Sequence, residues 1–171
     1  MKTTLALCLC GAALVATAAP AHAGHGTEIV VAPLGDSEVL KPGMRLFAIG
    51  APLGERLGLT RIGIHHERLP PGRRTSYPHA ESAEEEFVYV LEGHPDAWID
   101  GTLYRLSPGD AIGFPAGTGI CHTFLNNTDT EVRLLAIGEK PKAENRIHYP
   151  MNPEHEKTRQ DAWTDVTPRV L

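Results

Sequence analysis

The fold of this chain is decided by one segment, which reads PGRRTSYPHAESAEEEFVYVLEG at 71–93 and SPGDAIGFPAGTGICHTFLNN at 107–127. The first stretch carries His79, Glu81 and Glu86, and the second carries His122. β-Branched and aromatic residues follow Glu86 and His122, which is typical of strands. Glycine and proline separate these runs and indicate tight turns. The segment therefore predicts short strands that carry ionisable side chains.

The sequence on both sides of this segment continues the pattern of short strands. Asp100-Gly101 lies between two strand-like runs and is a strong signal for a two-residue hairpin turn. No amphipathic helical period of useful length occurs between residues 45 and 138. Strands at such close spacing predict an all-β sandwich or small barrel. The expected strands are 45–49, 57–68, 87–91, 96–100, 102–106, 111–114, 121–125 and 132–137.

Two adjacent histidines lie in the expected strand before this segment. In an extended chain Ile64 and His66 share one face, and His65 and Glu67 share the other. One of the two histidines must therefore point into the barrel. We expect a hydrogen-bonded structural histidine there, with a ligand or substrate contact as the alternative.

Length and composition indicate one ordinary globular domain. The chain has 171 residues, of which 42% are apolar and 22% are charged. A chain of this size can build one hydrophobic core. The formal net charge is −5 and no basic run occurs, so no nucleic-acid partner is expected.

The first residues read as a secretory signal peptide. Lys2 supplies a positive charge, an apolar stretch follows from 5 to 18, and Ala21-His22-Ala23 has the pattern of a cleavage site. The apolar stretch is too short to cross a bilayer comfortably. We expect residues 1–23 to be removed, so that the mature protein begins near Gly24. The expected location is periplasmic or secreted, with no membrane attachment after cleavage.

The rest of the chain divides into three regions. Residues 24–44 are expected to form a lead-in, residues 45–138 the barrel, and residues 139–171 a polar tail packed on the barrel. Within the tail, 148–150 is expected to add an edge strand and 153–163 to form a short helix, with Trp163 as the anchor.

The cysteine count depends on the signal peptide. Cleavage would remove Cys8 and Cys10 and leave Cys121, so no intramolecular disulfide is expected. Cys121 is expected to be an inert, small apolar residue.

Four side chains are candidates for chemistry. His79 and Glu81 are two residues apart on an extended segment, so they share a face. Glu86 shares a face with Val88 and Val90, and a carboxylate at the head of an apolar stripe is costly unless it is paired or bound to a metal. Together with His122, these residues suit a divalent ion of the Mn, Fe, Co, Ni or Zn type.

The order and spacing of these residues resemble the motifs of the cupin superfamily. The first cupin motif runs from a glycine through H-x-H and a glutamate to a second glycine. Its counterparts here are Gly72, His79-Ala80-Glu81, Glu86 and Gly93. The second motif runs from a glycine through P-x-G and a histidine to an asparagine. Its counterparts here are Gly109, Pro115-Ala116-Gly117, His122 and Asn126.

The resemblance implies a double-stranded β-helix, or jelly-roll, barrel. It implies a divalent transition metal (Mn, Fe, Ni or Zn) held by His79, Glu81, Glu86 and His122. Three departures from the motifs are present: Glu81 replaces the second histidine of H-x-H, the gap before His79 is one residue longer, and the gap before His122 is two residues longer. A second carboxylate favours Mn or Fe over copper.

Three functions remain open at this point. The first is a metal-dependent enzyme, a dioxygenase, isomerase or lyase that acts on a small polar molecule. The second is a non-catalytic module that binds a metal or a small ligand, and the third is a structural barrel without metal. Tyr77, His66 and, if it is not a metal ligand, Glu81 are the candidates for a general acid or base. A homodimer is expected by analogy with other jelly-roll sheets.

Overall fold

The computed structural model describes residues 47–166, which fold into ten strands and two short helices. The strands are β1 (Ile49–Pro52), β2 (Ile62–Leu69), β3 (Ala80–Glu81), β4 (Glu86–Glu92), β5 (Asp96–Ile99), β6 (Thr102–Arg105), β7 (Ala111–Phe114), β8 (His122–Leu125), β9 (Val132–Glu139) and β10 (Ile147–His148). The helices are α1 (Leu53–Arg56) and α2 (Pro153–Glu156). In the part of the chain described, neither helix is long and apolar enough to cross a membrane. The predicted signal peptide (1–23) and lead-in (24–44) lie outside the described residues.

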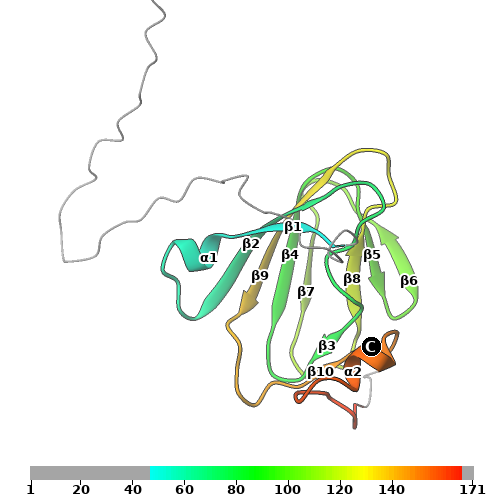
Figure 1. Ribbon diagram of the computed structural model, residues 1–171. Coiled ribbons are helices and arrows are strands. Elements are labelled where there is room, and N and C mark those ends of the chain that lie inside the picture. The colour runs from blue at the N-terminus through cyan, green and yellow to red at the C-terminus, as the bar shows by residue number, and fades with distance from the viewer. Residues whose placement is uncertain (1–46, 167–171) are drawn as a thin grey trace, which may run out of the picture.

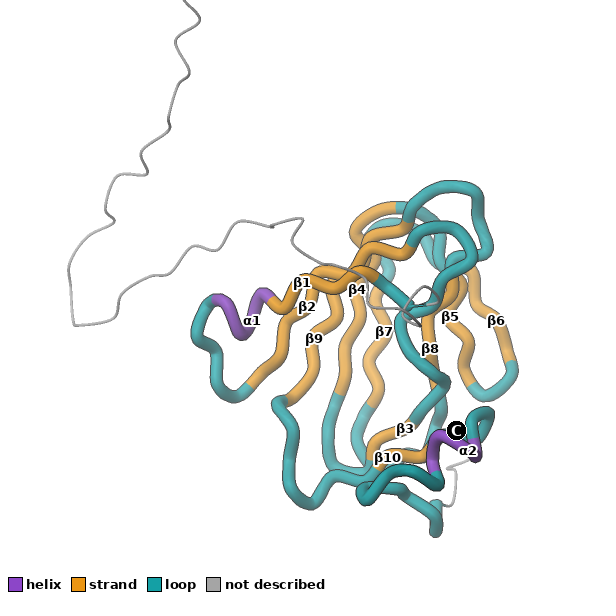
Figure 2. The backbone as a smooth tube through the Cα atoms, viewed as in Figure 1, coloured by secondary structure: helices purple, strands orange, loops and turns teal. Residues whose placement is uncertain are grey.

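The strands form an all-β barrel from antiparallel sheets (Figure 1). One sheet has the strand order β1-β2-β9-β4-β7, and the other has the order β6-β5-β8. Between β2 and β3 the chain runs beside β8, because isolated antiparallel bridges join Arg74 to Leu125 and His79 to His122. Strand β3 then pairs with β10 from the C-terminal tail, at the end of the barrel marked by α2 in Figure 2. The predicted all-β barrel is confirmed.

Apolar side chains from both sheets meet inside the barrel. Val88 and Val90 of β4, Leu134 of β9 and Phe124 of β8 are each 2% exposed or less. Burying one such side chain contributes about 1.5–3 kcal/mol. The core consists of Leu69, Val88, Val90, Ala97, Leu106, Phe114, Phe124, Val132 and Leu134.

The hairpin predicted from Asp100-Gly101 is present between β5 and β6. Both turn residues have positive φ, 43° at Asp100 and 91° at Gly101. The two-residue turn of type I′ requires this conformation at both central positions, and Asp-Gly is one of the pairs that adopt it readily.

Two boundaries at the start of the barrel differ from the predicted ones. Strand β1 begins at Ile49, where the predicted strand 45–49 ends, and β2 begins at Ile62, five residues after the predicted start. Helix α1 and a turn at Gly58, with φ of 73°, occupy the residues between them.

The tail contacts the barrel through the pairing of β10 with β3, and its helix is shorter than the predicted one. Strand β10 covers Ile147–His148, and the backbone N–H of Trp163 donates to the Ile147 carbonyl at 2.9 Å. Helix α2 ends at Glu156, because the N–H groups of Thr158 and Arg159 bond three residues back, the latter to the Glu156 carbonyl at 3.0 Å. These are turn bonds, so the predicted helix 153–163 is wrong beyond its first turn.

Candidate metal centre

Three of the four predicted ligands meet at one end of the barrel. His79 precedes β3, Glu86 begins β4 and His122 begins β8. Nε2 of His122 lies 3.1 Å from Oε2 of Glu86, and Nε2 of His79 lies 3.9 Å from the same oxygen. One potential ligand atom from each of the three residues lies within 4.8 Å of the others.

The backbone holds the two histidines side by side. The N–H of His79 donates to the His122 carbonyl at 3.1 Å, and the N–H of His122 donates to the His79 carbonyl at 2.9 Å. This closed antiparallel pair brings the imidazole centroids to 5.0 Å. Directly opposed residues in such a pair have neighbouring side chains, so the strand pairing itself places both rings at the site.

The tautomer of His79 is fixed by a carbonyl. Nδ1 of His79 lies 2.8 Å from the backbone oxygen of Tyr77 and 3.2 Å from Oγ of Ser76. A carbonyl oxygen only accepts hydrogen bonds, so Nδ1 carries the proton and Nε2 presents its lone pair towards Glu86. Burial lowers the pKa of His79, with a further contribution from His122, which favours the neutral ring that a metal needs.

His122 is held by an aromatic contact. Its ring stacks on Phe114 of β7, with centroids 3.5 Å apart and planes 7° from parallel. Its Nδ1 is buried and has no hydrogen-bond partner among residues 47–166. The hydrogen bond of the His122 ring to the protein is therefore the one between Nε2 and Glu86.

Glu86 supplies the charge of the group. Burial alone would raise the pKa of its carboxyl, but the hydrogen bond with His122 and the neighbouring imidazoles outweigh burial and lower it. The group thus offers two imidazole nitrogens and one ionised carboxylate. This donor set fits Mn, Fe, Ni or Zn, and the binding of an ion by these residues stays a prediction.

Glu81, the fourth predicted ligand, lies near this group but outside the three that meet. It ends β3, is partly buried, and lines a cavity of about 200 Å³ together with Glu86. Burial, followed by the charges of Glu84 and Glu86, raises its pKa to about 7. Its role as a ligand stays a prediction.

The C-terminal tail covers the site, which the sequence pattern did not indicate. Tyr149 is buried, and its ring stacks on that of His79 with centroids 5.9 Å apart. His155 meets Tyr149 edge to face at 4.8 Å and lies 5.1 Å from the ring of Tyr77. No local pattern signals such contacts, because they join residues about seventy positions apart along the chain.

The inward histidine of β2 is His65. His65 and Glu67 line the cavity beside Glu86, so strand alternation turns His66 to the opposite face of the sheet. There burial lowers the pKa of His66, and the positive charges of Arg133 and Arg68 lower it further. His66 is therefore not placed to serve as an acid or base in this cavity. Tyr77, another candidate, packs edge to face on Phe47 instead.

Cys121 behaves as the sequence predicted. It is 2% exposed, and its thiol lies 3.6 Å from the Gly119 carbonyl. Burial and the nearby charge of Asp100 raise its pKa to about 12. A protonated, buried thiol is a poor nucleophile and metal ligand.

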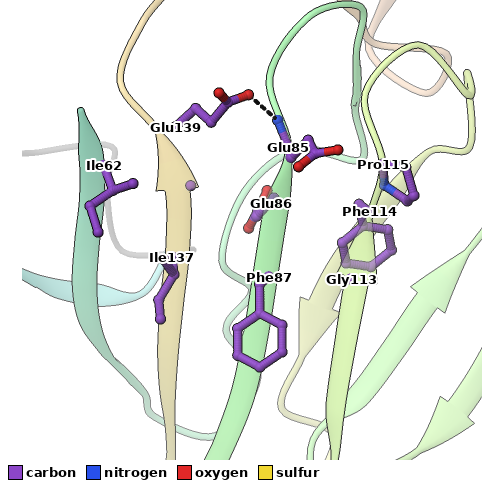
Figure 3. A pocket seen from close by; sticks show the side chains of 10 residues that line it. Ile62, Glu85, Glu86, Phe87, Gly113, Phe114, Pro115, Ile137 and Glu139 are labelled. Atoms are coloured by element: carbon purple, nitrogen blue, oxygen red, sulfur yellow. Dashed lines mark hydrogen bonds between the residues drawn. The ribbon is translucent and has the colours of Figure 1, made fainter.

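A second hollow lies on the outer face of the five-stranded sheet. Ile62, Ile137 and Phe87 project from β2, β9 and β4 there, as Figure 3 shows. Its volume is about 370 Å³, and the carboxylate of Glu139, which accepts a hydrogen bond from the Glu85 N–H at 3.1 Å, stands at its edge. This hollow is apolar and lies on the other side of the sheet from the inward-facing side chains of β2.

The fold and the site together define a small antiparallel barrel with a candidate metal centre at one end. Residues 65–138 match the model of a family described as the cupin domain. These residues therefore form a cupin domain, and the resemblance to the cupin superfamily noted in the sequence is confirmed.

Two solved structures are more than 30% identical to this chain over the aligned residues. A candidate sugar phosphate isomerase from Acidithiobacillus ferrooxidans is 31% identical, with 60% of this chain and 65% of that chain covered and a TM-score of 0.57. A sugar phosphate isomerase of the cupin superfamily from Silicibacter pomeroyi is 32% identical, with 60% and 64% covered and a TM-score of 0.58. This chain thus spans slightly less than two thirds of either protein.

A protein from Photorhabdus luminescens shares the fold. It is 23% identical, 67% of this chain and 89% of that chain are covered, and the TM-score is 0.54. The search of curated proteins gave no match.

Proposed function

We propose that this protein is an exported cupin that binds a divalent transition metal through His79, Glu86 and His122 and acts on a small polar molecule. The observation that carries the proposal is the meeting of three potential ligand atoms, from three separate segments, within 4.8 Å. The hydrogen bond that fixes the His79 tautomer supports it, since ligating histidines usually donate their other N–H to a carbonyl or carboxylate. When bound, such an ion supplies a Lewis acid that polarises an oxygen of the substrate.

Of the three reactions considered, isomerisation of a sugar-like molecule has the most support. The two similar structures at 31% and 32% identity carry the name of sugar phosphate isomerases. An isomerase needs a group that moves a proton between neighbouring carbon atoms. Glu81 lies on the cavity wall beside Glu86 without belonging to the group of three, and this supports its carboxyl as the group for that role.

Elemental mass spectrometry on the mature protein tests the metal centre. The protein is purified without chelators and without a histidine tag. We expect about one equivalent of Mn, Fe, Ni or Zn per chain. A chain that stays metal-free after reconstitution with each ion contradicts the proposal and leaves the ligand-binding module or the structural barrel.

The isomerase activity needs its own assay. The metal-loaded protein is incubated with aldoses in D₂O, and proton NMR follows the exchange of the hydrogen at C2. We expect exchange with the wild type and none with Glu81→Gln at equal metal content. Exchange that continues in Glu81→Gln would remove Glu81 from the proton transfer.

A non-catalytic binding module is the second candidate. The tail favours it, because Tyr149 stacks on one face of the His79 ring and leaves less of that ring exposed to a substrate. Saturable binding of a small ligand with no exchange or turnover would support this candidate over the enzyme.

Export is proposed from the N-terminal residues alone. Intact mass of the protein recovered outside the cytoplasm should correspond to a chain that begins near Gly24. A mass that retains residues 1–23 contradicts it.

A further inference from the structure

The cavity beside the candidate metal centre has an unusually uniform lining. Its volume is about 200 Å³, and Glu86 belongs both to its lining and to the metal group, which consists of His79, Glu86 and His122. Apart from Ala136, Ile137 and Gly138, its wall consists of one histidine and six glutamates. These are His65, Glu67, Glu81, Glu84, Glu85, Glu86 and Glu139. No lysine or arginine belongs to this lining.

Two cations near the cavity are engaged with other groups. Nζ of Lys142 donates to Oε2 of Glu139 at 2.6 Å and to the Ala83 carbonyl at 2.7 Å. On the tail side, Arg159 donates through Nε and Nη2 to both oxygens of Asp161, at 2.7 and 2.6 Å. A phosphate group that enters the cavity would reach Lys142 or Arg159 only by breaking one of these pairs.

The charge balance disfavours anionic ligands even with a metal bound. A divalent ion offsets two negative charges, and one of these is the carboxylate of Glu86. Among the other glutamates, Lys142 neutralises Glu139, and burial together with the charges of Glu84 and Glu86 leaves Glu81 partly protonated near pH 7. Glu84 and Glu85 still add negative charge to the wall. A cleft lined by one sign of charge concentrates ligands of the opposite sign and excludes its own. Carboxylates also accept hydrogen bonds but donate none when ionised, so they select hydroxyl and amine donors.

We propose that this cavity is the substrate pocket of the candidate metal centre, and that it takes a small polyol or amino-polyol without an anionic group. The proposal rests on the proposed function and narrows its substrate class, since it departs from the sugar phosphates named for the two similar structures. The size agrees, because about 200 Å³ lies below the roughly 300 Å³ at which pockets for drug-sized ligands begin. A single monosaccharide is the largest ligand of this kind that we expect.

Calorimetric titration of the metal-loaded full-length mature protein with three matched probes tests the proposal. The probes are glucose, glucosamine and glucose 6-phosphate, which share one ring and differ in charge. We expect glucose and glucosamine to bind at least about tenfold more tightly than the phosphate ester, with glucosamine the tightest. Equal or tighter binding of the phosphate ester overturns the proposal, and so does the absence of binding by both glucose and glucosamine.

One charge reversal in the lining and one outside it test whether the lining causes the preference for sugars without an anionic group. Glu85 is exposed at the cavity edge, so Glu85→Lys should fold, and it should narrow the preference for glucose over the ester by about threefold or more. The control is Glu55→Lys on α1, which is exposed and outside the lining and should leave the preference unchanged. An unchanged preference in Glu85→Lys contradicts the role of the wall.

The two proposals can fail separately. Metal content is measured before each titration, so loss of the metal centre is seen directly. The charge preference is then measured again on metal-free protein, in which the negative wall is not offset. A metal-loaded protein that prefers the ester would leave the proposed function standing and remove this substrate class.

Discussion

Strand β4 contributes to both ends of the barrel, and its inward side chains differ between them. At one end, called the closed end below, Val90 and Val88 are buried among apolar neighbours. At the other end, called the open end below, Glu86 meets the imidazoles of the candidate metal centre. Strand β2 repeats the change, with Leu69 buried at the closed end and His65 and Glu67 on the cavity wall. One alternation pattern thus serves two purposes: the closed end stabilises the barrel, and the open end carries the candidate chemistry.

The largest expected effect lies at the closed end. Leu134 is fully buried in the core, so Leu134→Ala should lower the free energy of unfolding by about 2–5 kcal/mol. The next residue, Leu135, faces the other side of β9 and is only partly buried, so Leu135→Ala should cost clearly less. Urea denaturation of both variants checks this. Equal losses would mean that the two faces of β9 do not differ as described.

The next effect is on metal affinity at the open end. His122→Ala should weaken metal binding by more than about a hundredfold, beyond what removal of a supporting residue usually costs. His94→Ala is the control, since His94 bonds the Leu106 carbonyl at 3.1 Å and lies outside the metal group. Metal content and affinity are measured by elemental analysis and competition titration.

His122 is buried against Phe114, so His122→Ala leaves a cavity, and a second variant that leaves none is also measured. Glu86→Gln keeps the size of the side chain and should also weaken metal binding strongly. Circular dichroism confirms that each variant is folded. Metal affinity equal to that of the wild type in folded His122→Ala would remove His122 from the site.

A smaller effect on metal affinity is expected when a group that hydrogen-bonds the His79 ring is removed. Ser76→Ala removes the hydroxyl at 3.2 Å from Nδ1 but leaves the Tyr77 carbonyl at 2.8 Å. Metal affinity should fall by less than about tenfold, because supporting residues usually contribute 10–100-fold and one partner remains. Ser107→Ala, in an exposed turn, should change nothing. A drop as large as that of His122→Ala would show that Ser76 does more than support the ring.

The smallest effects concern pH and have opposite signs at two carboxyl groups. At Asp96, burial would raise the pKa, but hydrogen bonds from Arg105 and Asn127 outweigh it and lower the pKa below its usual 3.8. The folded state then releases the proton more readily than the unfolded state. The stabilisation by Asp96 is present above pH 3.8 and is lost as the pH falls further.

At Glu81 the shift runs the other way, from 4.5 to a pKa of about 7. The folded state keeps a proton that the unfolded state releases, so stability falls as the pH rises from 4.5 towards 7. Relative to wild type, Glu81→Gln should gain stability over this range, while Asp96→Asn should lose stability that recovers only below pH 3.8. Urea denaturation of metal-free protein across pH checks both, and slopes of the same sign would contradict the opposite shifts.

The sequence predicts the barrel well, because its signals are local. The β-branched and aromatic run 87–91 and the Asp100-Gly101 turn indicate strands and a hairpin without reference to distant residues. The spacing of His79, Glu86 and His122 also places them at strand starts, and the structure brings these three together. Where a signal depends on one strand and one turn, prediction and structure agree.

The rest of the site depends on contacts between distant segments. Which of His65 and His66 faces inward is set by the pairing of β2 with β9, and the tail residue Tyr149 reaches His79 only through the pairing of β10 with β3. Phe114 looked like an ordinary strand residue but forms one wall of the metal group. Such placements follow from tertiary packing and leave no periodic trace in the sequence.

The stacking of Phe114 on His122, with centroids 3.5 Å apart, has a magnetic consequence. Protons that lie over the face of an aromatic ring are shielded by its circulating electrons. The imidazole protons of His122 should therefore resonate at lower frequency than those of the other histidines in an NMR spectrum. Any ligand that tilts His122 away from Phe114 would move these signals, which makes the pair a built-in reporter of events at the open end of the barrel.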